Sequence, residues 1–271
     1  MKQELICGDS LDVMREMKSG SIDIVCTSPP YNIKNKYNKY KDNLPKEDYL
    51  KWMRNVFIEI KRILKNNGSF FLNICSKNKE PLLIYEIVNE FKDIFIIQND
   101  IIWVKSICIG DDPNMSFGHY KPVNSDRFLH KTYEKIFHLT KNCDVKVDAL
   151  SIGLPYKWKC NRKNRKTGTV GVDLRSRGDS WFVKYETIQN KKERFYHPAP
   201  FPVILPEYCI KFHGIKKGMV VLDPFVGIGG TLIACKKLGI HGIGIDMDEK
   251  YCEDSKKRLM QYDKKKDKDN S

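Results

Sequence analysis

The sequence of 271 residues lacks several features that would place it in a familiar class at once. No run approaches the roughly 18 apolar residues that a membrane-spanning helix needs. The segment from Met1 to Glu4 runs directly into Gly8-Asp9-Ser10, which is not the pattern of a signal peptide. These absences predict a cytoplasmic protein without a membrane partner.

The nine cysteines include no Cys-x-x-Cys pair, which argues against a disulfide framework and against the common zinc sites. Most of them lie in apolar runs such as Ile24-Val25-Cys26, so we interpret them as buried small hydrophobic residues in a reducing compartment. A zinc site built from Cys143, Cys160 and a histidine would not match any common ligand spacing. We therefore predict no metal site.

Acidic residues are outnumbered: 34 Asp and Glu stand against 48 Lys and Arg, which gives a net charge of +14. Hydrophobic residues make up 41% and charged residues 30%, the composition of a globular protein with one large domain or one domain and an insertion. The basic excess predicts a polyanionic partner, with nucleic acid as the first candidate.

Short β-rich runs alternate with longer helical patterns, which predicts a doubly wound α/β fold with a mostly parallel sheet. The expected strands are 5–7, 22–26, 69–74, 96–104, 135–139, 220–223 and 241–246. The expected helices are 11–17, 46–64, 81–91, 202–212, 230–238 and 249–261. Asn67-Gly68 is expected to stop the second helix.

Residues 107–196 interrupt this alternation and are expected to form an inserted region. Within 157–194, twelve basic residues stand against four acidic ones, with tryptophans between them, which favours contact with DNA. The candidate DNA contacts are Lys163, Arg165, Lys166, Arg175 and Arg177. Residues 1–106 and 197–262 should together form one domain, and 263–271 a charged, frayed tail.

A glycine-rich turn follows the apolar run 219–222. It reads Asp223-Pro224-Phe225-Val226-Gly227-Ile228-Gly229-Gly230-Thr231, and its glycines let the backbone approach a ligand at a helix N-terminus. Asp246 ends the next expected strand, where a carboxylate can accept hydrogen bonds from ribose hydroxyls. Leu232 argues against a dinucleotide fingerprint, and the Gly-Lys-Ser/Thr of a P-loop is absent. The turn thus predicts a nucleotide-like cofactor.

Only about 48 residues follow the start of this turn, too few for a doubly wound sheet. The strands of residues 1–105 must therefore complete the same sheet. At the end of one of them stands Thr27-Ser28-Pro29-Pro30-Tyr31. Its prolines fix the backbone, so the carbonyls of Ser28 and Pro29 and the Ser28 hydroxyl form a rigid set of acceptors, while Tyr31 offers a ring for stacking on a base.

In this order the motifs resemble those of the amino-methyltransferases of DNA, in the circularly permuted class whose Ser/Asp-Pro-Pro-Tyr motif precedes the Asp-Pro-Phe-x-Gly-x-Gly loop. The resemblance covers nearly the whole chain and includes the segment His197-Pro198-Ala199-Pro200-Phe201-Pro202. It implies a Rossmann-like methyltransferase fold, S-adenosylmethionine as methyl donor, and 107–196 as the target-recognition region. The cofactor residues that it implies are Asp9, Asp223, Phe225, Gly227, Gly229, Thr231 and Asp246. The catalytic residues that it implies are Ser28, Pro29, Pro30 and Tyr31.

An exocyclic amino group is a poor nucleophile because its lone pair is delocalised into the ring. Acceptors such as Ser28 and the Pro29 carbonyl would draw its hydrogens out of the plane while the methyl group is displaced in line. Methylation at cytosine C5 would need a thiolate, usually in a Pro-Cys pair, and the sequence has none. The base has to leave the duplex, and Tyr31 would stack on it.

Serine at position 28 and a His-Pro-Ala-x-Phe-Pro segment accompany N4-cytosine methylation more often in the family, so we expect that target. N6-adenine methylation is the alternative, and a catalytically silent nucleic-acid-binding protein with the cofactor fold is an alternative of another class. RNA is less favoured as a substrate because no RNA-binding module is visible. The expected partner is double-stranded DNA, with a restriction endonuclease of the same restriction-modification system and a second copy of the chain as further candidates. The lysine- and tyrosine-rich loop 32–43 is expected to cover the active site.

Overall fold

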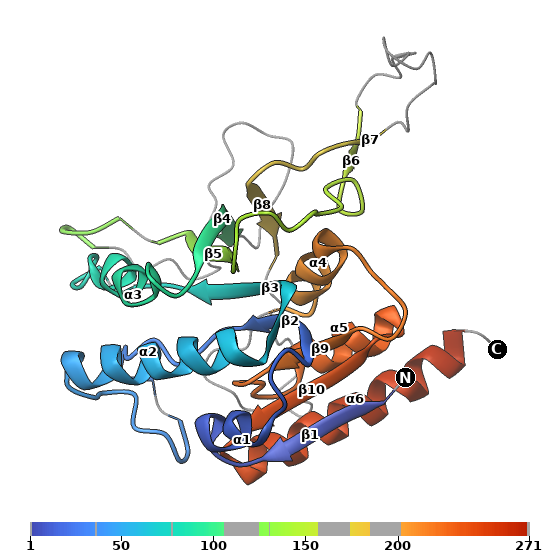
Figure 1. The fold of residues 1–271 in the computed structure, drawn as a ribbon, viewed down its shortest axis with the longest axis horizontal. Coiled ribbons are helices and arrows are strands. Elements are labelled where there is room, and N and C mark those ends of the chain that lie inside the picture. Colours follow the sequence, from blue (N-terminus) through green and yellow to red (C-terminus); the bar gives the residue numbers. More distant parts are fainter. Residues whose placement is uncertain are drawn as a thin grey trace.

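The computed structural model describes residues 2–35, 37–76, 78–105, 125–129, 131–156, 174–184 and 202–269, with side chains as far as 263. Their centre is an eight-stranded sheet (Figure 1). In spatial order its strands are β1 (Gln3–Cys7), β10 (His241–Asp246), β9 (Val220–Asp223), β2 (Ile22–Thr27), β3 (Leu64–Ile74), β5 (Tyr133–Thr140), β4 (Ile96–Lys105) and β8 (Ser180–Val183). Every neighbouring pair is parallel except those of β5, which runs antiparallel between β3 and β4. The predicted mostly parallel sheet is confirmed.

Strands β9 and β10, from the C-terminal part of the chain, lie between β1 and β2, from its start. The prediction that the early strands complete the same sheet is therefore confirmed. From β9 the chain proceeds to β10 in one direction, and from β2 it proceeds to β3 in the other. The order of the strands thus reverses between β9 and β2, and in open α/β sheets ligands bind at the carboxyl ends of the strands on either side of such a point.

Three helices pack on each face of the sheet (Figure 1). One face carries α1 (Ser10–Glu16), α2 (Lys46–Ile63) and α3 (Leu83–Phe91); the other carries α4 (Ile204–His213), α5 (Gly230–Leu238) and α6 (Glu249–Asp269). The apolar face of α2 is fully buried through Met53, Phe57 and Ile60, each worth roughly 1.5–3 kcal/mol of hydrophobic stabilisation. No helix in the described segments is long and apolar enough to cross a membrane.

Two expected boundaries are wrong. Helix α2 ends at Ile63 and β3 begins at Leu64, so Asn67-Gly68 does not stop the helix. These two residues lie within β3, in a bulge of residues 65–68 that do not pair with β2. A side chain at Gly68 would meet the backbone oxygen of Asp23 at 2.8 Å, which explains the glycine. Helix α6 continues to Asp269 through the expected frayed tail, because no helix breaker interrupts it and Lys236 of α5 pairs with Asp263.

The expected inserted region, 107–196, contributes to the sheet as well as projecting from it. Its strand β5 was expected, but β8 was not, and β8 extends the sheet beside β4. A separate two-stranded sheet joins β6 (Leu154–Pro155) to β7 (Leu174–Arg175) (Figure 1). The short β6, β7 and β8 carry too few residues for a period of two to be recognised.

Gly229 precedes α5 with a left-handed φ of 83°, and a side chain there would collide with Ser255 Oγ of α6. We expect Gly229→Ala to lower the free energy of unfolding by more than Gly20→Ala, measured by urea denaturation. Gly20 has a similar φ of 64° with no atom within 4 Å, so its substitution measures only the backbone strain, roughly 1–2 kcal/mol. Equal losses in the two variants would show that contact with α6 does not require a glycine here.

Candidate active site

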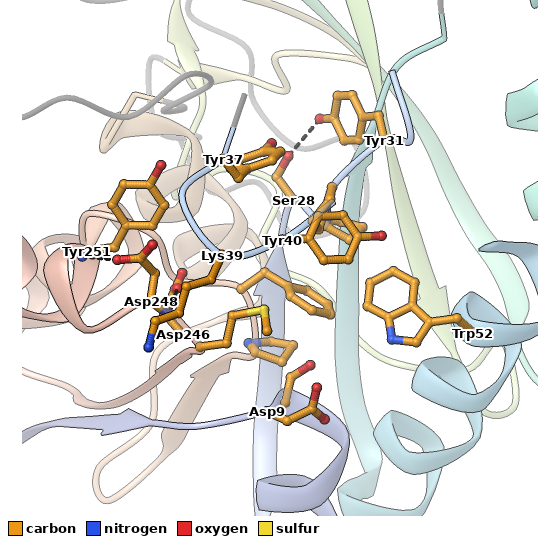
Figure 2. Close-up of a pocket in the computed structure, with 16 residues that line it drawn as sticks. Asp9, Ser28, Tyr31, Tyr37, Lys39, Tyr40, Trp52, Asp246, Asp248 and Tyr251 are labelled. Carbon is orange, nitrogen blue, oxygen red and sulfur yellow. Dashed lines mark hydrogen bonds between the residues drawn. The ribbon is translucent and has the colours of Figure 1, made fainter. Parts of the chain in front are cut away.

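The carboxyl ends of β1, β10, β9 and β2 surround a cavity of about 290 Å³. Figure 2 shows Asp246 and Asp248 on one side of it, Trp52 on the opposite side, and Ser28 with Tyr31 at one end. The two sequence motifs, nearly 200 residues apart along the chain, therefore meet in one place, as the sequence predicts for a strand tip beside the cofactor loop.

Asp223, at the end of β9, joins these motifs from behind the cavity. Its carboxylate is fully buried and accepts hydrogen bonds from Thr27 Oγ1 of β2 and Thr231 Oγ1 of α5, both at 2.6 Å, and from the amide of Phe225 at 3.1 Å. Burial raises the pKa of Asp223 to about 6 in spite of these donors. Asp223 and Thr231 are absent from the cavity lining, so their contacts hold the motifs together instead of reaching into the cavity.

The second carboxylate, Asp246 at the end of β10, does face the cavity. Its oxygens accept hydrogen bonds from the amides of Gly227 at 3.0 Å and Asp248 at 2.8 Å, and each retains a lone pair for a ligand. Burial raises its pKa to about 6. Asp9 lines the cavity too, and it caps α1 by accepting from the amides of Leu11 and Asp12.

Asp248 is a site residue that the sequence analysis missed. It is buried and lines the cavity; its Oδ1 caps α6, accepting from the amides of Lys250 and Tyr251, whereas its Oδ2 has no hydrogen-bond partner in the described part of the chain. A buried carboxylate oxygen without a donor is costly unless a ligand supplies one. Asp246 and Asp248 together suit a ligand with hydroxyl groups.

Aromatic rings form the opposite wall. The ring of Trp52 of α2 lies 5.5 Å from that of Phe225 and 5.9 Å from that of Tyr40, measured between ring centroids. Figure 2 shows Trp52 and Tyr40 on this wall. This apolar surface would hold a flat heteroaromatic ring. Trp52 was not predicted, although it lies within the expected helix 46–64, directly before the buried Met53.

The expected covering loop, residues 32–43, contributes Tyr37, Lys39 and Tyr40 to the cavity lining. Lys39 reaches across to Glu249 of α6, with 3.1 Å between its Nζ and the carboxylate. Buried Asp42 shapes the loop by accepting hydrogen bonds from the amides of Asn32, Ile33 and Asn35. The loop therefore walls the cavity; whether it opens stays a prediction.

The Ser28–Tyr31 motif lies at the end of β2, as expected. Ser28 Oγ lies 2.6 Å from Tyr31 Oη, and the Pro30 carbonyl accepts a hydrogen bond from Tyr49 Oη of α2 at 2.9 Å. Ser28, Pro29, Pro30 and Tyr31 all line the cavity. The tip of the strand is thus fixed by side chains as well as by its two prolines.

Three polar residues behind Tyr31 were not singled out from the sequence. Glu134 of β5 accepts a hydrogen bond from Tyr31 Oη at 3.2 Å, from Asn73 Nδ2 of β3 at 2.8 Å, and from Lys105 Nζ of β4 at 2.6 Å. Because β5 is antiparallel, its first residues lie at the same edge as the ends of its neighbours. A glutamate in a largely apolar strand was the signal that could have found this group.

The DNA-contact candidates are only partly visible. Arg175 is exposed on β7, whereas Arg177 donates to the carbonyl of Ile152 at 3.0 Å and lies over the ring of Tyr208 at 4.6 Å. Lys163, Arg165 and Lys166 lie outside the described residues, as does most of the segment 197–202. Among the residues described, no cluster of His, Cys, Asp and Glu is placed to hold a metal ion.

Known proteins resemble the chain in sequence. The profile of the N6/N4 DNA methylase family matches residues 22–257, which is most of the chain. The chain belongs to this family of DNA amino-methyltransferases. The methylase is 30% identical over 260 residues to the type II methyltransferase M.HpaI of Haemophilus parainfluenzae, an alignment that covers 96% of this chain and 74% of that protein.

Solved structures show the same fold. The PvuII DNA methyltransferase, described as cytosine-N4-specific, superposes with a TM-score of 0.68 at 17% identity, covering 97% of the methylase and 91% of that chain. A putative DNA modification methylase of Thermus thermophilus, in complex with S-adenosylmethionine, gives a TM-score of 0.61 at 22% identity and covers 96% and 94% of the two chains. The predicted methyltransferase fold is confirmed.

The raised pKa of Asp223 has a consequence for stability. Because its folded pKa of about 6 exceeds its ordinary value of 3.8, the charged form is disfavoured in the folded protein. We expect the free energy of unfolding of the wild type, relative to Asp223→Asn, to fall as the pH rises from 4 to 6, by about 2 kcal/mol.

Asp93→Asn is the control. The guanidinium of Arg54 lowers the pKa of exposed Asp93 to about 2, so this variant should differ from the wild type by a constant amount over the same pH window. Urea unfolding at several pH values gives both differences. A constant difference for Asp223→Asn would mean that the Asp223 carboxyl is not strained by its burial.

Proposed function

We propose that the protein transfers the methyl group of S-adenosylmethionine to the N4 amino group of cytosine in duplex DNA. The observation that carries this proposal is the Ser28 hydroxyl in the same cavity as the Asp246 carboxylate, so that an amine acceptor and a ribose partner face one ligand space. The name of the PvuII enzyme, which is cytosine-N4-specific, adds support.

The cavity fits the methyl donor in its chemistry. The carboxylates of Asp246 and Asp248 would accept hydrogen bonds from the ribose hydroxyls, which gives the unpaired Oδ2 of Asp248 a donor. The rings of Trp52 and Phe225 would hold the adenine, with Asp9 near it, and Gly227 and Gly229 shape the turn beside Asp246. When bound, S-adenosylmethionine supplies a methyl group on a positively charged sulfur.

The protein's own part in the chemistry is to prepare the amine. The Ser28 hydroxyl and the Pro29 carbonyl accept the two hydrogens of the amino group and draw them out of the ring plane, which exposes the nitrogen lone pair. Because Pro29 and Pro30 restrict the backbone and Tyr49 holds the Pro30 carbonyl, these acceptors are already in position before the base arrives. The bound donor would give up its methyl group and leave as S-adenosylhomocysteine, and the amino nitrogen, held by Ser28 and Pro29, would release one proton to water.

The ring of Tyr31 would contact the base that has left the duplex. Outside the cavity, exposed Arg175, together with Lys163, Arg165 and Lys166, would contact the DNA backbone from the target-recognition region. By contrast, the contacts of Arg177 with Ile152 and Tyr208 favour a role in holding this region to α4. In a restriction-modification system the partner would be an endonuclease that cuts the same unmethylated sequence, and a homodimer is a further proposal.

The direct test is incubation with labelled S-adenosylmethionine and DNA of mixed sequence, followed by mass spectrometry of the nucleosides. We expect N4-methylcytosine. Labelled N6-methyladenine would replace the proposed target atom with the alternative that the family allows. DNA binding without any labelled nucleoside would favour a silent binding protein.

Substitutions at the two ends of the cavity should affect methyl transfer and cofactor binding differently. We expect Ser28→Ala to abolish most methyl transfer with an unchanged dissociation constant for S-adenosylmethionine, because Ser28 faces the base. Asp246→Ala should weaken cofactor binding by on the order of tenfold, since it removes a charged acceptor. Calorimetric titration and single-turnover assays measure the two effects, and cofactor affinity lost in step with activity in Ser28→Ala would contradict this assignment.

A further inference from the structure

A serine hydroxyl is both a donor and an acceptor, whereas methyl transfer to an amine requires Ser28 to accept. The amino group already has two hydrogens to offer, so a Ser28 proton directed at it would oppose binding and leave its lone pair in the ring. Something must therefore fix the direction of the Ser28 proton. This requirement rests on the proposed function and holds for cytosine and adenine alike.

The hydrogen bonds behind Ser28 meet this requirement. Ser28 Oγ and Tyr31 Oη are 2.6 Å apart, and Tyr31 Oη is 3.2 Å from Glu134 Oε2 (Figure 2 shows the first of these contacts). A carboxylate has no proton to give, so the single Tyr31 proton points to Glu134. The Tyr31 oxygen then accepts the Ser28 proton, which leaves the lone pairs of Ser28 Oγ for the substrate.

The opposite direction is unfavourable. If Tyr31 donated to Ser28, its lone pairs would face the carboxylate of Glu134 in a buried site, where electrostatic repulsion is strong. Burial, followed by the charge of Glu134, raises the pKa of Tyr31 well above its ordinary value, so the phenol keeps the proton that the chain of hydrogen bonds needs.

Glu134 is itself held as an acceptor. Lys105 Nζ donates to its Oε1 at 2.6 Å and Asn73 Nδ2 donates to its Oε2 at 2.8 Å, so among the described residues each partner of the carboxylate is a donor. The three residues come from β3, β4 and β5, the rigid part of the sheet next to β2. The direction of the chain of hydrogen bonds is thus set by side chains whose positions are fixed by strands of the sheet.

We propose that Glu134 is a positioning residue that, through Tyr31, orients the Ser28 hydroxyl as a hydrogen-bond acceptor for the target amino group. Glu134 does not touch the base. Tyr31 thus has two roles: its ring stacks on the base, and its hydroxyl group orients the Ser28 hydroxyl.

Glu134→Gln tests this with little change of shape. Lys105 needs an oxygen, so the new amide nitrogen takes the place of Oε2, where it faces Asn73 as well as Tyr31. Asn73 then has to turn its Oδ1 towards this nitrogen, while the nitrogen donates to Tyr31 Oη and turns the Tyr31 proton towards Ser28. We expect the single-turnover rate of methyl transfer to fall by on the order of 10- to 100-fold, because an acceptor at the amine becomes a donor. The dissociation constants for S-adenosylmethionine and DNA should stay close to those of the wild type, whereas the melting temperature should fall, because Lys105 loses its charged partner.

Tyr31→Phe removes the hydroxyl and keeps the ring. We expect it to lose activity as well, since Ser28 is then free to rotate, and we expect Glu134→Gln to change the rate less than about twofold in the Tyr31→Phe background. A wild-type rate in Tyr31→Phe would overturn the proposal even if Glu134→Gln failed to fold. Equal losses from Glu134→Gln in both backgrounds would overturn it too, because a purely structural effect does not pass through the Tyr31 hydroxyl.

Glu207→Gln is the matched control. Glu207 of α4 is also a buried glutamate with lysine partners, Lys211 at 2.7 Å and Lys237 at 2.6 Å, and it does not line the cavity. It should lower stability without a selective loss of the transfer rate. Total label in DNA is the measurement, so a product on adenine changes the proposed target atom but leaves this test valid. A wild type that methylates no DNA would instead reject the methyl transfer on which the proposal rests.

Discussion

The buried carboxylate of Asp223 is the interaction on which the site depends. The carboxylate accepts hydrogen bonds from the Thr27 hydroxyl at the end of β2 and from the Thr231 hydroxyl at the start of α5. Thr27 and Asp223 are 196 residues apart in the sequence, so these bonds hold two distant segments together. Burying this charge is costly, as its raised pKa shows, and three donors offset the cost. The strand order reverses at this junction, so the Ser28–Tyr31 tip and the glycine-rich loop after β9 are held side by side.

From this junction the cavity divides into two chemical halves. On the β10 side the acceptors are carboxylates, Asp246 and Asp248, which suit hydroxyl groups. On the β2 side they are the neutral oxygens of Ser28 and Pro29, which suit the hydrogens of an amino group. The halves share a wall of rings around Trp52.

The sequence predicted the fold well because its strands were apolar runs and its motifs stood at their ends. The C-terminal strands β9 and β10 and helix α5 were placed at their observed bounds, since an aspartate ends each strand and a glycine stands at each end of the helix. The short strands of the projecting region carried no such pattern. Trp52 and Glu134 were missed because each enters the site through tertiary packing from an element that no motif marks. Asp248 was missed although it lies only two residues after Asp246.

A serine at the catalytic tip needs more support than a carboxylate would. An aspartate at position 28 would have acceptors only and could present them to an amine in any rotamer. A serine can present either its lone pairs or its proton, and a free hydroxyl would lose much of its preorganisation to rotation. The hydrogen bond from Tyr31 to Glu134 removes the rotational freedom of the Ser28 hydroxyl. Lys105 and Asn73 hold the Glu134 carboxylate in place by donating hydrogen bonds to it. Ser28, directly after β2, and Glu134, on β5, therefore act as one unit. Ser28 contacts the amino group, and Tyr31 links it to Glu134.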